Sequence, residues 1–154
     1  MASLTGRLAN FTSKHVPWLN RSATHRQIAQ FRKSGGEKGN RLFGRPTFIL
    51  DVVGRSSGES RPVMLMLVRD GDDLVVCGSN GGNPQTPNWY RNLTAAGGGH
   101  VEVGADRWAV TATELSPGAG RDRPWALLTE NYPDFASYQE LTDRSLPVAV
   151  LRRV

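Results

Sequence analysis

From Thr47 onward the chain consists of short apolar runs, most of them ended by a turn of glycine, proline or charged residues. We predict six strands, at Thr47–Val53, Arg61–Arg69, Asp73–Cys77, His100–Val103, Arg107–Leu115 and Pro147–Leu151. The near-continuous apolar centre of the second run predicts burial on both faces, and Asp70-Gly71 predicts a hairpin turn after it. Six short strands at close spacing favour an antiparallel barrel in an α+β fold.

Helical patterns are expected mainly towards the two ends of the chain. One helix is predicted at Ser3–Lys14, where Pro17 interrupts it, and a second at Ser22–Lys33 with Ile28 and Phe31 facing the core. Three later helices are predicted at Pro87–Leu93, Gly120–Glu130 and Phe135–Leu141. Thr86 is predicted to be the N-cap of the first of these, and Ala96–Gly99 is predicted to form a turn after it. The strand–helix alternation of a Rossmann sheet is missing, and so are its G-x-G-x-x-G motif and the P-loop pattern.

The positive charge of the chain is concentrated at its N-terminus. The net charge is +5, yet Met1–Gly36 contains no acidic residue and six basic ones: Arg7, Lys14, Arg21, Arg26, Arg32 and Lys33. The remaining residues therefore net −1, which is the charge of the whole chain less these six. A basic arm can meet membrane phosphates, nucleic acid or an anionic ligand. Its helices either cover the core or lie on a membrane surface as a basic amphipathic segment.

We expect residues 1–43 to form a basic helical arm and linker, and residues 44–154 to form the barrel domain. Ser34–Gly44 is glycine-rich and polar, which is typical of a flexible connection. The longest apolar run, Val63–Val68, is far shorter than a membrane span, and the N-terminus lacks the apolar segment of a signal peptide. The single cysteine, Cys77, excludes an intramolecular disulfide and is expected to be a buried thiol. A cytoplasmic location is therefore expected, with peripheral contact between the arm and a membrane as an open alternative.

Two glycine-containing turns are the candidates for ligand binding. Gly54–Arg61 reads G-R-S-S-G-E-S-R, in which two guanidinium groups bracket hydroxyls and backbone donors suited to phosphate or carboxylate. The alternative is an ordinary hairpin loop with solvated arginines. Gly78–Pro84 contains three glycines that let the backbone approach a flat ring or a phosphate, with Ser79 and Asn80 able to donate to a carbonyl. Taken alone, this second turn is equally compatible with a plain loop.

Residues for nucleophilic or metal chemistry are poorly placed. The three histidines, His15, His25 and His100, are isolated, so no metal site is predicted. Ser79 has neither a G-x-S-x-G elbow nor a nearby histidine, which argues against a hydrolase triad. The pattern indicates a protein that positions a reactive small molecule, as cofactor enzymes do.

Four motifs then occur in order: T-F-I-L-D-V-V-G-R-S-S-G-E-S-R-P-V (Thr47–Val63), G-S-N-G-G (Gly78–Gly82), P-N-W-Y-R-N-L (Pro87–Leu93) and N-Y-P-D-F-A-S-Y-Q-E-L-T-D-R-S-L-P-V (Asn131–Val148). With this order and spacing, residues 44–150 resemble the deazaflavin-dependent nitroreductase family, the F420-dependent quinone and nitroimidazole reductases of actinobacteria. The resemblance implies a split β-barrel, related to the flavin-reductase and PNP-oxidase barrels, with coenzyme F420 bound in a groove.

The resemblance also implies roles for particular residues. The phosphate and glutamate tail of F420 would contact Arg55, Ser56, Ser57 and Arg61. The deazaflavin ring would lie against Pro62, Val63, Ser79, Asn80, Gly81 and Gly82, with Trp89, Arg91 and Asn92 supporting it. Tyr132 and Tyr138 match tyrosines that close over the substrate in the nitroreductase.

In the reaction that this resemblance implies, hydride passes from C5 of the reduced deazaflavin to a small acceptor. The acceptors expected are quinones, activated enones or lactones, and nitroaromatics. Ser79 would donate a hydrogen bond to the acceptor oxygen, and Tyr138 or solvent would deliver the proton.

This chain departs from the family pattern at three positions. Ser56 and Asn80 stand where the family often has lysine, which would weaken binding of an anionic cofactor. Phe135 stands where tyrosine can occur, which argues more against nitroimidazole activation than against reduction in general. Two alternatives therefore stay open: a split barrel that binds FMN or haem instead, and a non-catalytic barrel that binds lipid or membrane. Nucleic-acid binding is not expected, and monomer and dimer are both compatible with the sequence.

Overall fold

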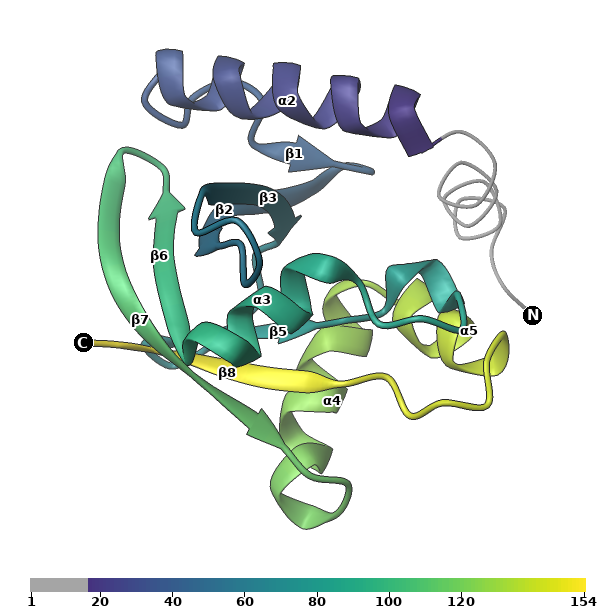
Figure 1. The fold of residues 1–154 in the computed structure, drawn as a ribbon. Helices are drawn as coiled ribbons and strands as arrows, with labels where there is room; N and C mark the ends of the chain where they lie inside the picture. The colour runs from purple at the N-terminus through teal and green to yellow at the C-terminus, as the bar shows by residue number, and fades with distance from the viewer. Residues whose placement is uncertain (1–16) are drawn as a thin grey trace.

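The computed structural model describes residues 17–154, in which eight antiparallel strands are accompanied by four α-helices and one short 3-10 helix (Figure 1). The strands are β1 (Arg41–Leu42), β2 (Arg45–Val53), β3 (Ser60–Met66), β4 (Arg69–Asp70), β5 (Asp73–Cys77), β6 (Gly98–Val103), β7 (Asp106–Leu115) and β8 (Val148–Arg153). The helices are α2 (Pro17–Lys33), the 3-10 helix η1 (Asn80–Gly82), α3 (Asn88–Ala96), α4 (Ala119–Asn131) and α5 (Asp134–Glu140).

The eight strands form one sheet that curls into a half-barrel. The hydrogen-bonded order is β1-β2-β6-β7-β8-β5-β4, with β3 paired to β2. Only two residues separate β3 from β4, although these strands pair with β2 and β5, which are distant in that order. The sheet must therefore bend back on itself, which confirms the α+β split barrel predicted from the strand spacing. The six predicted strands correspond to β2, β3, β5, β6, β7 and β8. The other two strands have two residues each: β1 was not predicted, and Arg69 of β4 was predicted to continue the strand that ends at Met66.

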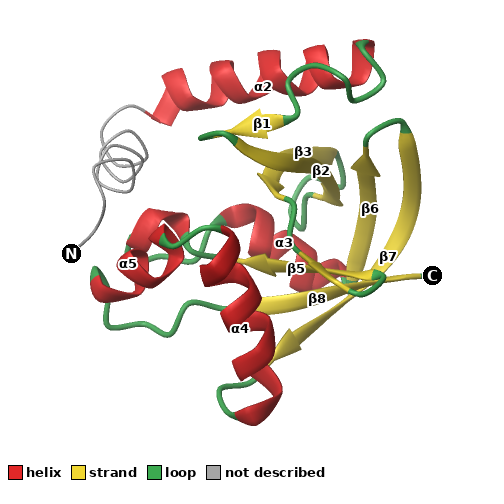
Figure 2. Ribbon diagram, turned by 180° about the vertical axis from the view of Figure 1, so that it is seen from behind, coloured by secondary structure: helices red, strands yellow, loops and turns green. Residues whose placement is uncertain are grey.

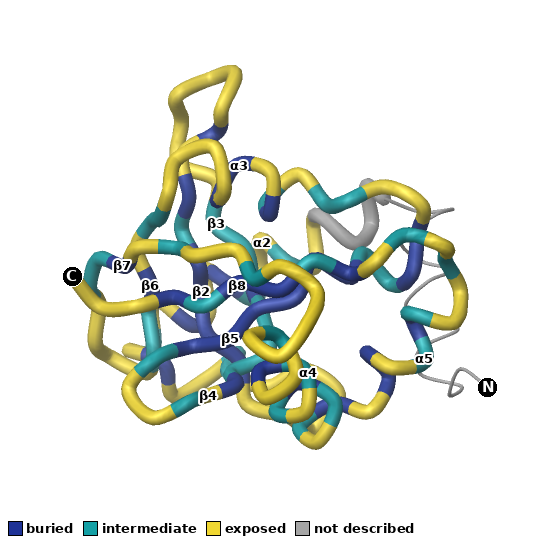
Figure 3. Tube along the Cα trace, turned by 90° about the horizontal axis from the view of Figure 1, so that it is seen from below, coloured by how far each residue is buried: buried dark blue, intermediate teal, exposed yellow. Residues whose placement is uncertain are grey.

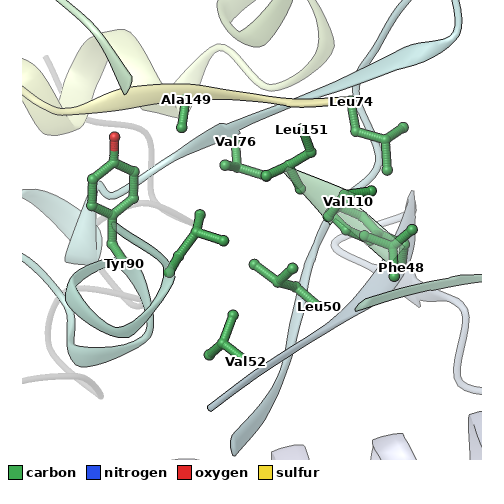
Figure 4. Close-up of a cluster of buried hydrophobic side chains, with 11 residues drawn as sticks. Phe48, Leu50, Val52, Leu74, Val76, Tyr90, Val110, Ala149 and Leu151 are labelled. Carbon is green, nitrogen blue, oxygen red and sulfur yellow. The ribbon is translucent and has the colours of Figure 1, made fainter. Parts of the chain in front are cut away.

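Apolar side chains are buried on both faces of the sheet, and the helices pack against them. Inward-facing Phe48, Leu50 and Val52 of β2 belong to the core inside the curl (Figure 4). On the other face of β2, Ile49 packs with Ile28 and Phe31 of α2, as the helix pattern predicted. Helix α2 lies against β3, while α4 lies against β5 and β8 (Figure 2). The buried segments run along β2, β5 and β8, in the middle of the molecule (Figure 3).

Several element boundaries differ from prediction for local reasons. Helix α2 already begins at Pro17, since proline fits the first turn of a helix, and the predicted helix Ser3–Lys14 lies outside the described residues. The Thr86 N-cap is wrong: the N-cap is Pro87, whose carbonyl accepts from Tyr90 and Arg91 with no side-chain cap.

Two further expectations change at the sheet edges. The predicted turn Ala96–Gly99 is wrong in its second half, because Gly98 and Gly99 begin β6. A Cβ at Gly98 would lie 2.1 Å from the carbonyl oxygen of Val110, so the strands approach closely there. The predicted burial of both faces of Arg61–Arg69 is also wrong, since most residues of β3 are half-buried.

The glycine-rich segment after α2 is packed against the barrel. The Gln27 amide donates to the carbonyls of Gly39 and Arg41 at 3.0 and 2.9 Å, and β1 pairs with β2. The division of the chain at residues 43 and 44 stays a prediction. No helix within residues 17–154 has the length and apolarity that a membrane crossing needs.

Burial of Cys77 leads to a pH-dependent prediction. The residue is 7% exposed, and burial raises the pKa of its thiol from 9.0 to about 12. The unfolded chain therefore loses this proton at lower pH than the folded protein, and the free energy of unfolding should fall as pH rises from about 9 towards 12. The Cys77→Val variant should lack this part of the fall. Urea denaturation of the wild-type protein and of Cys77→Val at pH 8 and pH 10.5 measures the free energy of unfolding of each. If the difference between the two proteins were the same at both pH values, the prediction would be contradicted.

Candidate functional site

Two adjoining cavities lie between α2, β3 and the turns after β2 and β5. The larger has a volume of about 850 Å³ and many polar residues in its walls, among them two arginines, and the smaller has about 320 Å³ and mostly apolar walls. Thr24, Val63, Asn80 and Trp89 line both. A ligand could therefore extend from one cavity into the other across these four residues.

The tight turn between β2 and β3 forms one wall of the larger cavity. The carbonyl of Gly54 accepts a hydrogen bond from the Gly58 amide at 2.8 Å, and the Gly54 amide donates to the backbone carbonyl of Glu59 at 2.8 Å. A Cβ at Gly54 would lie 2.5 Å from the Ser57 hydroxyl, so a larger residue there would require the Ser57 side chain to move. The turn therefore exposes Ser56 and Ser57 towards solvent at the cavity wall.

Arg55 is positioned by neutral partners. Its Nη1 donates to Asn92 Oδ1 at 2.7 Å, and its Nη2 donates to Asn88 Oδ1 at 3.2 Å. The backbone amide of Arg55 also donates to Asn92 Oδ1, at 3.2 Å. Within residues 17–154 no carboxylate forms an ion pair with Arg55. Two amides of α3 thus orient a guanidinium whose positive charge is available to an anionic ligand.

Arg61 is the second guanidinium of this wall, and its partners are weak. Its Nη2 lies 2.9 Å from a Glu59 carboxylate oxygen, with side chains 53% and 68% exposed, and 3.3 Å from the Ser57 hydroxyl. Exposed ion pairs contribute little to stability, so an anionic ligand can compete with Glu59 for this guanidinium.

The turn after β5 is organised by Arg144, a residue to which the sequence analysis assigned no role. Its guanidinium donates to four backbone carbonyls, those of Gly78, Ser79, Asn83 and Gln85, at 2.8–3.3 Å. No carboxylate within the described residues pairs with it. Burial lowers the pKa of Arg144, although an arginine stays charged in proteins. A single half-buried cation therefore cross-links the loop around Ser79.

Ser79 itself lies at the wall of the smaller cavity. Its residue is 9% exposed, and its side chain makes no capping hydrogen bond to the 3-10 helix that follows. Gly81 and Gly82 then adopt positive φ angles of 62° and 78°. A Cβ at Gly82 would lie 2.6 Å from the Tyr138 carbonyl oxygen, so this glycine lets the turn pack against α5.

Aromatic side chains form the opposite wall of the smaller cavity. The hydroxyls of Tyr132 and Tyr138 lie 3.2 Å apart, and Phe135 packs edge-on against both rings. Burial raises the pKa of both tyrosines, with the adjacent Asp134 acting in the same direction. Both hydroxyls are therefore protonated at neutral pH and can donate hydrogen bonds.

Most predicted site residues line these cavities. The larger is lined by Arg55, Ser56, Ser57, Arg61, Pro62, Val63, Asn80, Trp89 and Asn92, and the smaller by Val63, Ser79, Asn80, Gly81, Trp89, Tyr132 and Tyr138. Gly82 and the exposed Arg91 line neither.

Other residues, which were not predicted from the sequence, reach the cavities from the N-terminal side. Thr24 and His25 of α2 line the larger cavity, and Leu42 and Phe43 line the smaller. Nothing in the local sequence marks them, because their position depends on how α2 and β1 pack against the barrel.

Comparison with known proteins gives consistent matches. A family model described as F420H(2)-dependent quinone reductase matches residues 23–153. An F420H(2)-dependent quinone reductase of Mycobacterium tuberculosis (strain ATCC 25618 / H37Rv) is 35% identical over 128 residues, which cover 81% of this chain and 86% of the relative.

Two solved structures are similar along most of their length. An F420-H2 dependent reductase, FDR-A, is 37% identical and covers 70% of this chain and 95% of its own, with a TM-score of 0.65. A structure described as a domain-swapped dimer is 31% identical and covers 88% of this chain and 98% of its own, with a TM-score of 0.67.

Proposed function

The chain belongs to the F420H(2)-dependent quinone reductase family, and we propose that it takes reducing equivalents from F420H2 and transfers them to a small electron-poor acceptor, a quinone above all. The observation that supports this most is the pair of adjoining cavities, one with two arginines and one apolar. Activated enones, lactones and nitroaromatics are the further acceptors that we include in the proposal.

The residues present fit a cofactor with a flat ring and a polyanionic tail. In the larger cavity, no carboxylate among residues 17–154 pairs with Arg55, and Arg61 pairs with the exposed Glu59, which suits phosphate and carboxylate groups. Trp89 and Val63, which line both cavities, offer apolar surface for a ring at the junction. We propose that Arg55, Ser56, Ser57 and Arg61 bind the tail there.

Bound F420H2 would supply a hydride, and the protein would position the acceptor and manage its charge. We propose that the Ser79 hydroxyl donates to the acceptor oxygen, where negative charge develops. Tyr138 and Tyr132 would supply the second polar contact, because their hydroxyls stay protonated and face the same cavity. With raised pKa values they are weak acids, so solvent can complete the proton delivery.

The partners beyond substrate and cofactor belong to the same proposal. A relative that is 31% identical is described as a domain-swapped dimer, which supports testing this chain for a dimer. The six basic residues of Met1–Gly36 support testing it for peripheral contact with anionic membranes.

Anaerobic turnover tests the proposed function directly. The purified protein is mixed with F420H2 and a soluble naphthoquinone, and reoxidation of F420 is followed by absorbance. We expect quinone-dependent reoxidation well above the rate without protein. Reduction driven by FMNH2 but not by F420H2 would contradict the proposal and favour the FMN alternative.

Arg61 and its neighbour Glu59 make opposite predictions about cofactor affinity. Arg61→Ala should raise the Kd for F420 roughly tenfold, since one charge-assisted hydrogen bond is lost. Glu59→Gln should lower the Kd, because it frees the guanidinium from its ion pair at 2.9 Å. Fluorescence titration of both variants with F420 measures these shifts, and an unchanged Kd in Arg61→Ala would overturn the assignment of the tail site.

A further inference from the structure

An unusual backbone conformation occurs beside the apolar cavity. Within residues 17–154, only two residues other than glycine have a positive φ, Phe43 at 50° and Asn80 at 48°. Both line the apolar cavity. Asparagine tolerates the left-handed region, whereas a bulky aromatic residue is rarely found there.

The conformation of Phe43 follows from a two-residue hairpin turn. Leu42 of β1 pairs with Arg45 of β2, so Phe43 and Gly44 form the turn, and their φ angles are 50° and 73°. Hairpin turns with two positive φ angles strongly prefer asparagine, aspartate or glycine at the first position. Arg41 Nη1 donates to the Gly44 carbonyl at 3.0 Å and holds the turn. Phenylalanine is thus a poor choice for the local backbone.

Core packing does not explain this choice either. Phe43 is 45% exposed and belongs to none of the buried apolar clusters. Its ring lies parallel to that of Tyr132, with an interplanar angle of 4° and ring centroids 6.1 Å apart. Strained backbone conformations concentrate at ligand-binding sites, where a contact made by the side chain compensates for the strain.

We propose that Phe43 is an acceptor-contacting residue that forms one wall of the apolar cavity and selects flat ring acceptors over small acyclic ones. This inference rests on the proposed function. Phe43 and Phe135 present apolar ring faces, while Ser79, Tyr132 and Tyr138 provide the hydroxyls of this cavity. Such a cavity matches a ring with hydrocarbon faces and one or two oxygens, as in a quinone.

The Phe43→Gly variant tests this inference, because glycine suits the turn better than phenylalanine does. We expect KM for a naphthoquinone to rise at least tenfold and KM for methyl vinyl ketone to change less than threefold. The Kd for F420 should stay within twofold and the Tm should stay equal or rise. Val53→Ala is the control, since Val53 is 53% exposed, comparably to Phe43, and lines neither cavity.

Each other outcome decides against the inference or against its premise. An unchanged ratio of the two KM values, or a Tm lowered by several degrees, would show that Phe43 serves the fold or another partner. If the wild-type protein oxidised no F420H2, the proposed function would fail instead. Calorimetric binding of the naphthoquinone to wild type and Phe43→Gly would then still decide whether Phe43 binds the ring.

Discussion

Ser79→Ala is expected to lower kcat for quinone reduction roughly 100-fold, because removal of one donor to a developing oxyanion has costs of this size. The substitution removes only the hydroxyl, which makes no capping hydrogen bond to the 3-10 helix, so the turn should keep its shape. The Kd for F420 should therefore change less than threefold. Steady-state turnover and fluorescence titration of the same preparation measure the two quantities.

Ser56→Ala is the matched control for this first prediction. Ser56 lines the larger cavity and is absent from the smaller one, so loss of its hydroxyl should alter the cofactor Kd more than kcat. If Ser79→Ala retained full turnover, the acceptor oxygen would have to bind elsewhere, and the assigned role of Ser79 would be wrong.

Arg144→Gln is expected to lower the free energy of unfolding by roughly 2–4 kcal/mol, because four backbone carbonyls lose a charged donor. It should also lower kcat/KM at least tenfold, since the loop that positions Ser79 loses its cross-link. Arg144→Lys should recover only part of both effects, because an ammonium group lacks the planar fork of five donors.

Urea denaturation and steady-state kinetics test this second prediction together. Arg152→Gln is the control, because Arg152 is also an arginine but is 71% exposed and pairs with Asp73 at the surface, so its loss should change little. Equal effects of the Arg144 and Arg152 substitutions would show that the loop does not depend on the Arg144 guanidinium.

The strand pattern could be predicted from the sequence because each long strand is a local apolar run bounded by a turn. The Asp70-Gly71 signal, for example, marks a hairpin in which Asp70 pairs with Asp73 across Gly71 at a φ of 62°. The short strand β1 could not be predicted, because its two residues are exposed and its hairpin turn begins with Phe43, where such turns prefer asparagine, aspartate or glycine. The predicted Thr86 N-cap is wrong because Pro87, in an extended conformation, is the N-cap, and its carbonyl accepts the first hydrogen bonds of α3.

Contiguous motifs predicted much of the candidate site, and long-range contacts account for the rest. Arg55 and Arg61 could be identified because both flank one turn, which the barrel positions at a cavity. Arg144 lies 59–66 residues from the carbonyls to which it donates, and Phe43 and Tyr132 are also far apart in the sequence although their rings are stacked. Such pairs become neighbours only when the sheet curls, so no local pattern marks them.

The two positions where the family often has lysine are used differently here. Asn80 Nδ2 donates to the Gln85 carbonyl at 2.9 Å, so this side chain stabilises the turn after β5. Ser56 is exposed at the cavity wall and provides a hydroxyl without charge. In the proposed tail site, the positive charge therefore comes from Arg55 and Arg61, which line the larger cavity.

The choice of cofactor is tested most directly by titrating the purified protein with oxidised F420 and, in parallel, with FMN, with cofactor fluorescence as the signal. If the two cavities bind a deazaflavin ring and its anionic tail, F420 should bind with a Kd in the micromolar range or tighter, and FMN at least tenfold more weakly. Tighter binding of FMN would contradict the choice of cofactor while leaving the barrel intact. Binding of neither would contradict the reductase proposal and favour a barrel that binds lipid or membrane.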